Sequence, residues 1–248
     1  MNTGGKQAYV IQRTVPTLAW GREGGGFHTR ISLFNYYSLL SEDPPVSSRA
    51  CIYLFDEDGR EAGRKERTLG PREQWQFDLS SAVGDFQGSV AVQLIPDPFP
   101  QLRHERYVGT LFFATYWDAA GHYDYTHETD RMRFDDDESV QYESTPIPTS
   151  PSVEMSVILQ SNYFGADADL CDPCCEVVVK GANGETLAEE TLDLAPRSSR
   201  IVGLEAVLPD WRRRLGGQGG SVHVKGRHIN QPMTFIRHAS GDFNIHHF

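Results

Sequence analysis

Short runs of apolar residues, rich in Val, Ile, Phe and Tyr, follow one another along the chain, with Gly, Pro, Asn and Asp between them. Runs of this length and composition are typical of β-strands. The spacing of three to four residues between apolar positions that marks an amphipathic helix is almost absent. The pattern predicts an all-β protein with a strand about every eight to twelve residues.

The strand pattern occurs twice. Residues 50–59 and 175–184 each form an apolar run that ends in Asp-Gly or Asn-Gly, and the two runs lie 125 positions apart. Both dipeptides supply the positive φ angles of a tight hairpin. At the same separation, Leu69-Gly-Pro71 matches Leu194-Ala-Pro196.

Two further matches follow in the same order. Gly88-Ser-Val-Ala-Val92 matches Gly220-Ser-Val-His-Val224 at a separation of 132, and residues 113–127 match 233–247 at a separation of 120. The separations change because each copy carries extra residues in one loop, around 209–219 in the second copy and around 96–107 in the first. Four matches in one order predict a tandem duplication.

The duplication divides the chain into a first β-sandwich at 8–128, a linker at 129–152 and a second β-sandwich at 153–248. The strand spacing favours antiparallel sandwiches with Ig-like or jelly-roll connections. The linker contains Asp135-Asp-Asp-Glu138, followed by Pro146, Pro148 and Pro151. Like charges repel and proline favours extended backbone, so the segment is predicted to be a semi-rigid linker or a strand-flanking arm; an acidic cation-binding patch is the alternative.

The first copy, from His28-Thr-Arg-Ile-Ser-Leu-Phe-Asn35 through Asp58-Gly59 to Gly88-Ser-Val, resembles small bacterial β-sandwich proteins of the sensory rhodopsin transducer type, and the second half repeats the pattern. Members of that family are single-domain, self-associating interaction proteins proposed to bind small molecules or partners. The resemblance therefore implies a binding protein, and it brings no catalytic residues with it.

Charge and cysteine content narrow the range of partners. The formal net charge of -11 disfavours nucleic acid, whose affinity rests on Lys and Arg. No apolar run approaches the roughly 20 residues of a spanning helix, and Met1 to Gln7 lacks the layout of a secretory signal, so we expect a cytoplasmic protein without membrane insertion. Three of the four cysteines lie within five residues, which is not a disulfide framework, and free thiols are expected.

Histidine and acidic residues of the first copy suggest a metal site. If the first and last strands end near each other, His28, His122, Asp124 and His127 would converge with Glu128 on a nitrogen and oxygen site suited to zinc, iron or manganese. Alternation along 121–127 predicts that Tyr123, Tyr125 and His127 face inward, and that His122 and Asp124 face outward. The other interpretation is that these histidines only cap the core.

Cys171-Asp-Pro-Cys174-Cys175 has the Cys-x-x-Cys spacing of a metal knuckle or a redox pair. A second pair is missing, so a turn that leads into a buried strand is the favoured interpretation. Aromatic residues are more numerous in the first copy than in the second. Among them, Trp20, Tyr36 and Trp117 are predicted to bind a ligand, since aromatic side chains supply much of the burial energy in grooves and interfaces.

The favoured function is a non-catalytic binding or assembly module that engages a protein partner or self-associates, and that needs no cofactor. The sequence contains no nucleophile elbow and no phosphate-binding loop, which argues against an enzyme. One alternative is a metal-dependent enzyme that uses a divalent metal at the His and Asp cluster. The other is a small-molecule or carbohydrate binder that uses the aromatic residues.

Overall fold

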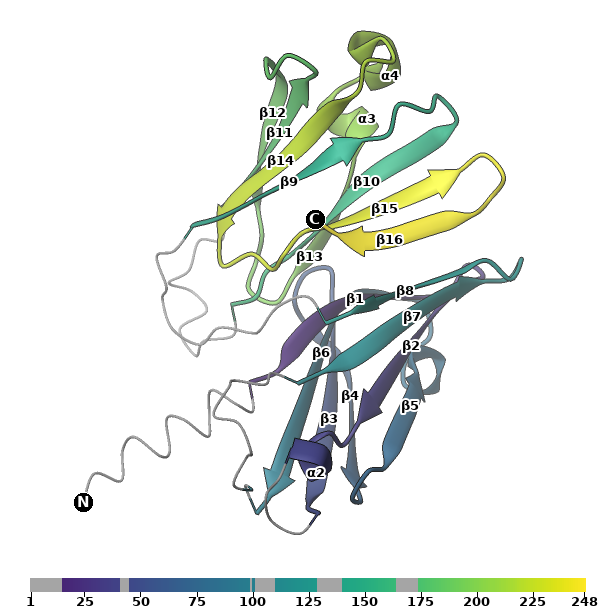
Figure 1. Cartoon of the computed structure of the whole chain (residues 1–248), viewed down its shortest axis with the longest axis vertical. Helices are drawn as coiled ribbons and strands as arrows, with labels where there is room; N and C mark the ends of the chain where they lie inside the picture. Colours follow the sequence, from purple (N-terminus) through teal and green to yellow (C-terminus); the bar gives the residue numbers. More distant parts are fainter. Residues whose placement is uncertain (1–14, 41–44, 99, 101–109, 129–139, 164–173) are drawn as a thin grey trace, which may run out of the picture.

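The computed structural model describes residues 15–40, 45–98, 100, 110–128, 140–163 and 174–248 (Figure 1). Within these residues the chain forms sixteen β-strands in four antiparallel sheets of four strands each. The helices α2 (Tyr37–Leu40), α3 (Leu204–Val207) and α4 (Trp211–Leu215) are all short. The prediction of an all-β protein is confirmed.

The first half of the chain folds into one sandwich of two sheets. Sheet 1A has the strand order β1-β6-β3-β4 and sheet 1B has the order β5-β2-β7-β8. The strands are β1 (Thr17–Glu23), β2 (Phe27–Phe34), β3 (Ser47–Asp56), β4 (Glu61–Leu69), β5 (Gln74–Asp78), β6 (Phe86–Asp97), β7 (Phe112–Asp118) and β8 (Tyr123–His127).

The second half repeats this topology strand for strand. Sheet 2A has the order β9-β14-β11-β12 and sheet 2B has the order β13-β10-β15-β16, so each strand has the neighbours of its counterpart eight places earlier. The strands are β9 (Val140–Ile147), β10 (Val153–Gln160), β11 (Cys174–Gly181), β12 (Thr186–Asp193), β13 (Ser199–Gly203), β14 (Gly220–Arg227), β15 (Met233–His238) and β16 (Phe243–His247). The chain is a tandem duplication of two antiparallel sandwiches.

Two segments differ from what the sequence suggests. The predicted linker, 129–152, contains β9, which pairs with β14 as β1 pairs with β6, so the second sandwich includes residues before 153. Its acidic run, 135–138, lies outside the described residues. The extra residues around 209–219, predicted as a loop, include α4, because Trp211 and Leu215 bury their side chains in the second core.

Alternation along the strands builds the cores. In β2, every second side chain from Phe27 to Leu33 is buried between the two sheets of the first sandwich. In β10, Val153, Met155, Val157 and Leu159 are buried in the core of the second sandwich. No helix in the described part of the chain has the length and apolar character needed to cross a membrane.

Sheet 2B has two buried faces. One face covers the core of its own sandwich. The opposite face lies against the first sandwich, where the edge strands β1 and β8 run (Figure 1). Its side chains join the first core through Ile158, Met233, Phe243 and Ile245, which pack in one cluster with Trp20 and Phe27. The two sandwiches therefore share apolar contacts across their junction.

Candidate binding site

The edge strands β8 and β16 lie side by side and bring histidines of the two copies together (Figure 1). The Nε2 atoms of His127 and His247 are 2.8 Å apart, and their rings meet edge to face. His127 Nδ1 lies 2.7 Å from the backbone oxygen of Glu128, so a proton on Nδ1 would leave Nε2 as an acceptor. The backbone N–H of Ile245 donates to the Asp124 carboxylate at 2.7 Å.

His122 forms a second bridge between the sandwiches. Its Nδ1 lies 2.9 Å from Asp118 Oδ2 and its Nε2 lies 2.9 Å from Asp242 Oδ1. The hydrogen bond to Asp118 raises the pKa of His122, with further raising by the charges of Asp118 and Asp242, and it lowers the pKa of Asp118. A proton on His122 therefore strengthens a contact that joins the two copies.

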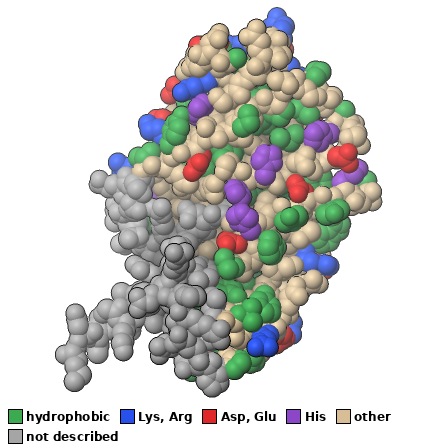
Figure 2. Space-filling view, viewed as in Figure 1, with side chains coloured by type: hydrophobic (Ala, Val, Ile, Leu, Met, Phe, Trp, Pro, Cys, Tyr) green, Lys and Arg blue, Asp and Glu red, His purple; other side chains and the backbone are tan. Residues whose placement is uncertain are grey.

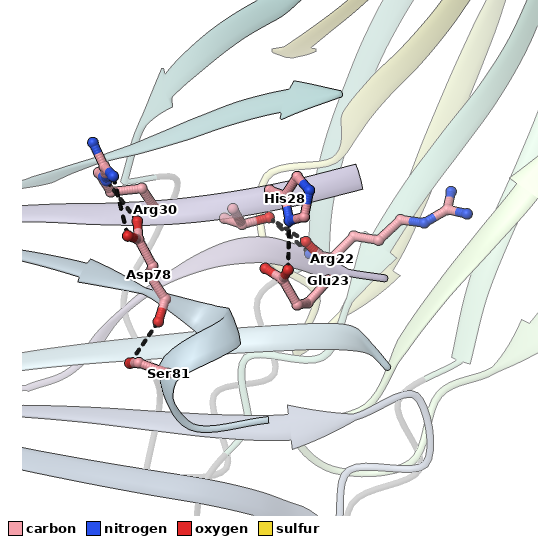
Figure 3. A network of polar contacts seen from close by, with 7 residues as sticks. Arg22, Glu23, His28, Arg30, Asp78 and Ser81 are labelled. Atoms are coloured by element: carbon pink, nitrogen blue, oxygen red, sulfur yellow. Dashed lines mark hydrogen bonds and ion pairs between the residues drawn. The ribbon is translucent and has the colours of Figure 1, made fainter. Parts of the chain in front are cut away.

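His28 lies elsewhere, on the outward side of sheet 1B. Its Nδ1 is 2.6 Å from Oε1 of Glu23, a side chain that is almost fully buried (Figure 3). The imidazole also stacks on the Trp117 ring at a centroid distance of 5.4 Å. Glu23 and Trp117 thus hold the ring on two sides.

The predicted metal residues do not meet at one point. His28, His122, Asp124 and His127 each have a different partner, and no group of three or more His, Cys, Asp or Glu side chains among the described residues is placed to hold a metal ion. The partners of three of them come from the second copy. The sequence alignment already contained this signal, since it pairs His127 with His247 and His122 with Asp242 at a separation of 120.

The predicted facing of β8 is wrong. Tyr123 and Tyr125 are 72% and 61% exposed, whereas Thr126 is buried. The register explains this, because Asp124 and Thr126 lie opposite the inward-facing residues Tyr116 and Ala114 of β7. In β16 the equivalents Phe243 and Ile245 are buried, but against the first sandwich and not in their own core.

The three predicted ligand-binding aromatics lie in different environments. Trp20 is fully buried at the junction, with its ring centroid 6.2 Å from that of Phe235. Tyr36 is buried against Tyr37. Only Trp117 lies partly open to solvent, where it stacks on His28 and lies beneath the Arg30 guanidinium at 5.4 Å.

We define the aromatic face as the outward side of β7 and β8 in sheet 1B. It consists of Phe113, Trp117, Tyr123 and Tyr125, with Trp117 paired to Tyr123 across the strands. The Phe113 side chain is 52% exposed and meets the Tyr125 ring edge to face at 6.1 Å. Exposed aromatic side chains gathered on one sheet face are unusual for a surface that only meets water.

Figure 2 shows histidine side chains across the middle of one side of the molecule, along the junction, with hydrophobic side chains next to them. The aromatic face is continuous with the junction, because His127, which contacts His247 of the second copy, ends the strand that carries Tyr123 and Tyr125.

The cysteine motif is largely outside the description. Cys171 lies outside the described residues, as does the side chain of Cys174, so the Cys-x-x-Cys prediction stays a prediction. Cys51 is buried and free, and Cys175 is buried. Burial is the main reason why the pKa of Cys51 is raised, which keeps this thiol protonated and unreactive.

Comparison with known proteins gives little. No family model matches the chain, and no curated protein matches it either. Among solved structures it is similar to exo-chitosanase CsxA of Amycolatopsis orientalis bound to PNP-beta-D-glucosamine, at 11% identity and a TM-score of 0.19, over 82% of this chain and 24% of that one. It is also similar to a beta-glucuronidase from glycoside hydrolase family 2, at 11% identity and a TM-score of 0.18, over 93% of this chain and 23% of that one.

The chain thus spans about a quarter of the length of these enzymes, and similarity at this level carries no argument about function. The resemblance to sensory rhodopsin transducer proteins stays a prediction.

Proposed function

We propose that the chain is a non-catalytic binding module that engages a protein surface, either a partner or a second copy of itself, through the aromatic face. The observation that carries the proposal is the contrast between repeat-equivalent positions. Phe113, Tyr123 and Tyr125 are more than half exposed, while their equivalents Met233, Phe243 and Ile245 are buried where sheet 2B meets the first sandwich.

This contrast matters because both copies present apolar side chains on the same face of the same sheet. In the second copy that face packs against the first sandwich, as two proteins pack at an interface. In the first copy the same face is open. Aromatic residues are enriched in the buried centres of interfaces, and Trp, Tyr and Arg supply most hot spots.

Charge supports the same proposal. In a chain of net charge -11, Asp78 is the one carboxylate among the described outward-facing side chains of the strands in sheet 1B. It is paired with Arg30 through two hydrogen bonds of 2.6 and 3.0 Å (Figure 3). The face therefore offers no unpaired negative charge to repel an approaching protein.

The location proposed with this function is the cytoplasm. The buried free thiol of Cys51 supports it, because thiols persist in reducing compartments.

The test places a photo-crosslinking amino acid at position 125 and, in a separate sample, at the exposed control position 142 of β9. We expect protein adducts from position 125 that disappear in the Tyr123→Ser variant. Sedimentation of the purified chain between about 10 and 200 μM, a range suited to weak interfaces, measures self-association and so shows whether the partner in an adduct is a second copy. Adduct yields equal at both positions and insensitive to Tyr123→Ser would contradict the proposal.

A further inference from the structure

Three hairpin turns meet at one end of the junction and enclose a hollow of about 430 Å³. The turns are those between β1 and β2, between β7 and β8, and between β15 and β16, so both copies contribute. The lining includes Arg22, His122 and Arg237 together with the backbone of Gly25, Gly26 and Gly241. Small-molecule sites occur preferentially at such boundaries between domains and have volumes in this range.

The two arginines are the reason to consider an anion. Each guanidinium lies over an aromatic ring, Arg22 over Phe27 at 5.5 Å and Arg237 over Phe235 at 5.7 Å. The two rings are themselves in contact, with centroids 6.1 Å apart. Stacking on a ring orients a guanidinium and leaves its in-plane N–H donors free for an oxyanion.

Neither arginine is neutralised by a carboxylate in the described part of the chain. Within the described residues, no carboxylate lies within ion-pair distance of Arg22 or Arg237. Figure 3 shows the Arg22 guanidinium extending away from Glu23 and His28, with no contact drawn to it. Glu154 lies opposite Arg237 in the strand register, but the two form no ion pair.

The acidic residues beside the hollow are already engaged. Asp118 accepts hydrogen bonds from the backbone N–H groups of Ala120 and His122 and faces the His122 ring. Asp242 faces the other ring nitrogen of His122 and accepts a hydrogen bond from the Ser240 hydroxyl. What remains open in the hollow is the positive charge of two guanidinium groups.

Two glycines with left-handed backbone form the turn between β1 and β2 at the hollow. Gly25 and Gly26 have φ angles of +61° and +81°, and a Cβ at Gly25 would meet nothing within 4 Å. Gly25 therefore combines a backbone conformation that favours glycine with open space in front of the chain, whereas a Cβ at Gly26 would lie 3.5 Å from the Ala119 Cβ.

We propose that this hollow binds a small molecule through a doubly charged oxyanion group, a phosphate or a pair of carboxylates, held between Arg22 and Arg237. A bidentate guanidinium suits both groups. The site needs both copies of the duplication, since Arg22 belongs to β1 and Arg237 to β15. It is distinct from the aromatic face and does not depend on the proposed protein partner.

The experiment uses the full chain, with inorganic phosphate and succinate as probes at matched ionic strength and chloride as the reference anion. Calorimetric titration should give one saturable site for at least one of the two probes. Replacing one guanidinium removes charge-assisted hydrogen bonds, so Arg22→Gln and Arg237→Gln should each weaken binding about tenfold or more. Arg213→Gln, which removes an equal charge from α4 of the second sandwich, should leave affinity unchanged.

A second measurement works even if a variant folds poorly. In ¹H–¹⁵N spectra of the unmodified chain, the amide signals of Gly25, Gly26 and Gly241 should shift with the probe, and the Gly184 signal, in a distant turn, should not. Binding of phosphate alone identifies a phosphate ligand, and binding of succinate alone identifies a dicarboxylate. No saturable binding of either probe, or affinities equal in Arg22→Gln and Arg213→Gln, would overturn the proposal.

Discussion

Tyr116 lies in β7 with its ring fully buried and its hydroxyl 2.9 Å from the Trp20 carbonyl oxygen, to which it donates. Burial raises the pKa of this hydroxyl, so Tyr116 stays a neutral donor. The bond joins β7 to β1 across the first core, beside the contact between Trp20 and Phe235. One residue thus supports both the sandwich and the junction.

Tyr116→Phe should lower the free energy of unfolding by about 1–2 kcal/mol, because it leaves the buried Trp20 carbonyl without its donor. Denaturation in urea measures the change. Tyr125→Phe is the matched control: its side chain is exposed, so the expected effect is below about 0.5 kcal/mol. Equal effects of the two substitutions would show that the Tyr116 bond contributes nothing.

His122 gives the junction a pH dependence. Its pKa is raised in the folded chain, so its contribution to stability is fully present below the unfolded pKa of about 6.5 and is lost as the pH rises through the folded pKa. The lowered pKa of Asp118 acts at the other end: its contribution is present above about 3.9 and is lost as the pH falls through the folded value.

The melting temperature of His122→Gln should therefore fall furthest below that of the unmodified chain in weak acid, and the difference should shrink as the pH is raised well above neutrality. Differential scanning fluorimetry across this range measures it. His238→Gln, at a half-buried histidine that contacts Asn244 and no carboxylate among the described residues, serves as the control and should show no such trend. A His122→Gln deficit that does not vary with pH would contradict the ionic role.

At the scale of elements, the Gly-Ser-Val repeat has a structural reason. An ideal Cβ on Gly88 would lie 1.9 Å from the Phe55 carbonyl oxygen, and one on Gly220 would lie 2.5 Å from the Lys180 carbonyl oxygen. The strand β6 approaches β3, and β14 approaches β11, too closely for any side chain. The duplicated glycine therefore marks the same close contact in both sandwiches.

Gly88→Ala and Gly220→Ala should each destabilise the chain by about 1–3 kcal/mol, the usual cost of overpacking, and the larger effect is expected at Gly88. Chemical denaturation measures both. Gly84→Ala, where a Cβ meets nothing within 4 Å, is the control and should be close to neutral. The argument fails if Gly88→Ala is as stable as Gly84→Ala.

The sequence predicted most strands and failed at particular ones. It identified the hairpins that end at Gly59 and Gly184, because positive φ in a tight turn is a local requirement that both glycines meet. It missed β9, because prolines and neighbouring acidic residues are more typical of a linker than of a strand. Pro146 can lie in β9 because only β14 flanks that strand, so one side needs no ladder hydrogen bonds.

At the scale of the whole molecule, the shared apolar contacts couple the two sandwiches. Phe243 of the second copy is 3% exposed and its ring lies 5.0 Å from that of Phe27 in the first. Gln160 extends the contact with polar bonds, donating to the carbonyl oxygen of Ala19 at 3.0 Å and contacting the Ser89 hydroxyl at 2.9 Å. Two sandwiches joined in this way should unfold together.

Calorimetry of the unmodified chain should show one transition, with equal calorimetric and van't Hoff enthalpies. Phe243→Ser removes a buried ring from the junction, should cost about 3–5 kcal/mol, and should separate the unfolding of the two sandwiches into two transitions. Tyr123→Ser changes the repeat-equivalent, exposed residue and should retain one transition. Two transitions in the unmodified chain would contradict the coupling.

The sequence predicted some residues of the candidate site and not the contacts between them. His122, Asp124 and His127 could be selected from the sequence because polar and titratable residues recur at matched positions of the two copies, and Trp117 because the first copy is richer in aromatic residues. The alignment also pairs His122 with Asp242 and His127 with His247, but matched positions in a repeat do not say that two residues are in contact. Asp242, Ile245 and His247 lie about 120 residues further along the chain, and only the packing of sheet 2B on the first sandwich brings them near.

The sequence by itself determined the strands, the hairpin turns and the duplication, because alternation, turn glycines and repeated motifs are properties of neighbouring residues. The tertiary structure alone decided which face of each sheet is buried. Alternation separates the two sides of β8 and β16 but does not say what covers them. Tyr123 therefore faces solvent, while Phe243, at the same place in the repeat, lies inside the molecule. The reason is that the outward face of sheet 2B packs against the first sandwich, whereas the outward face of β8 in sheet 1B is not covered by the second.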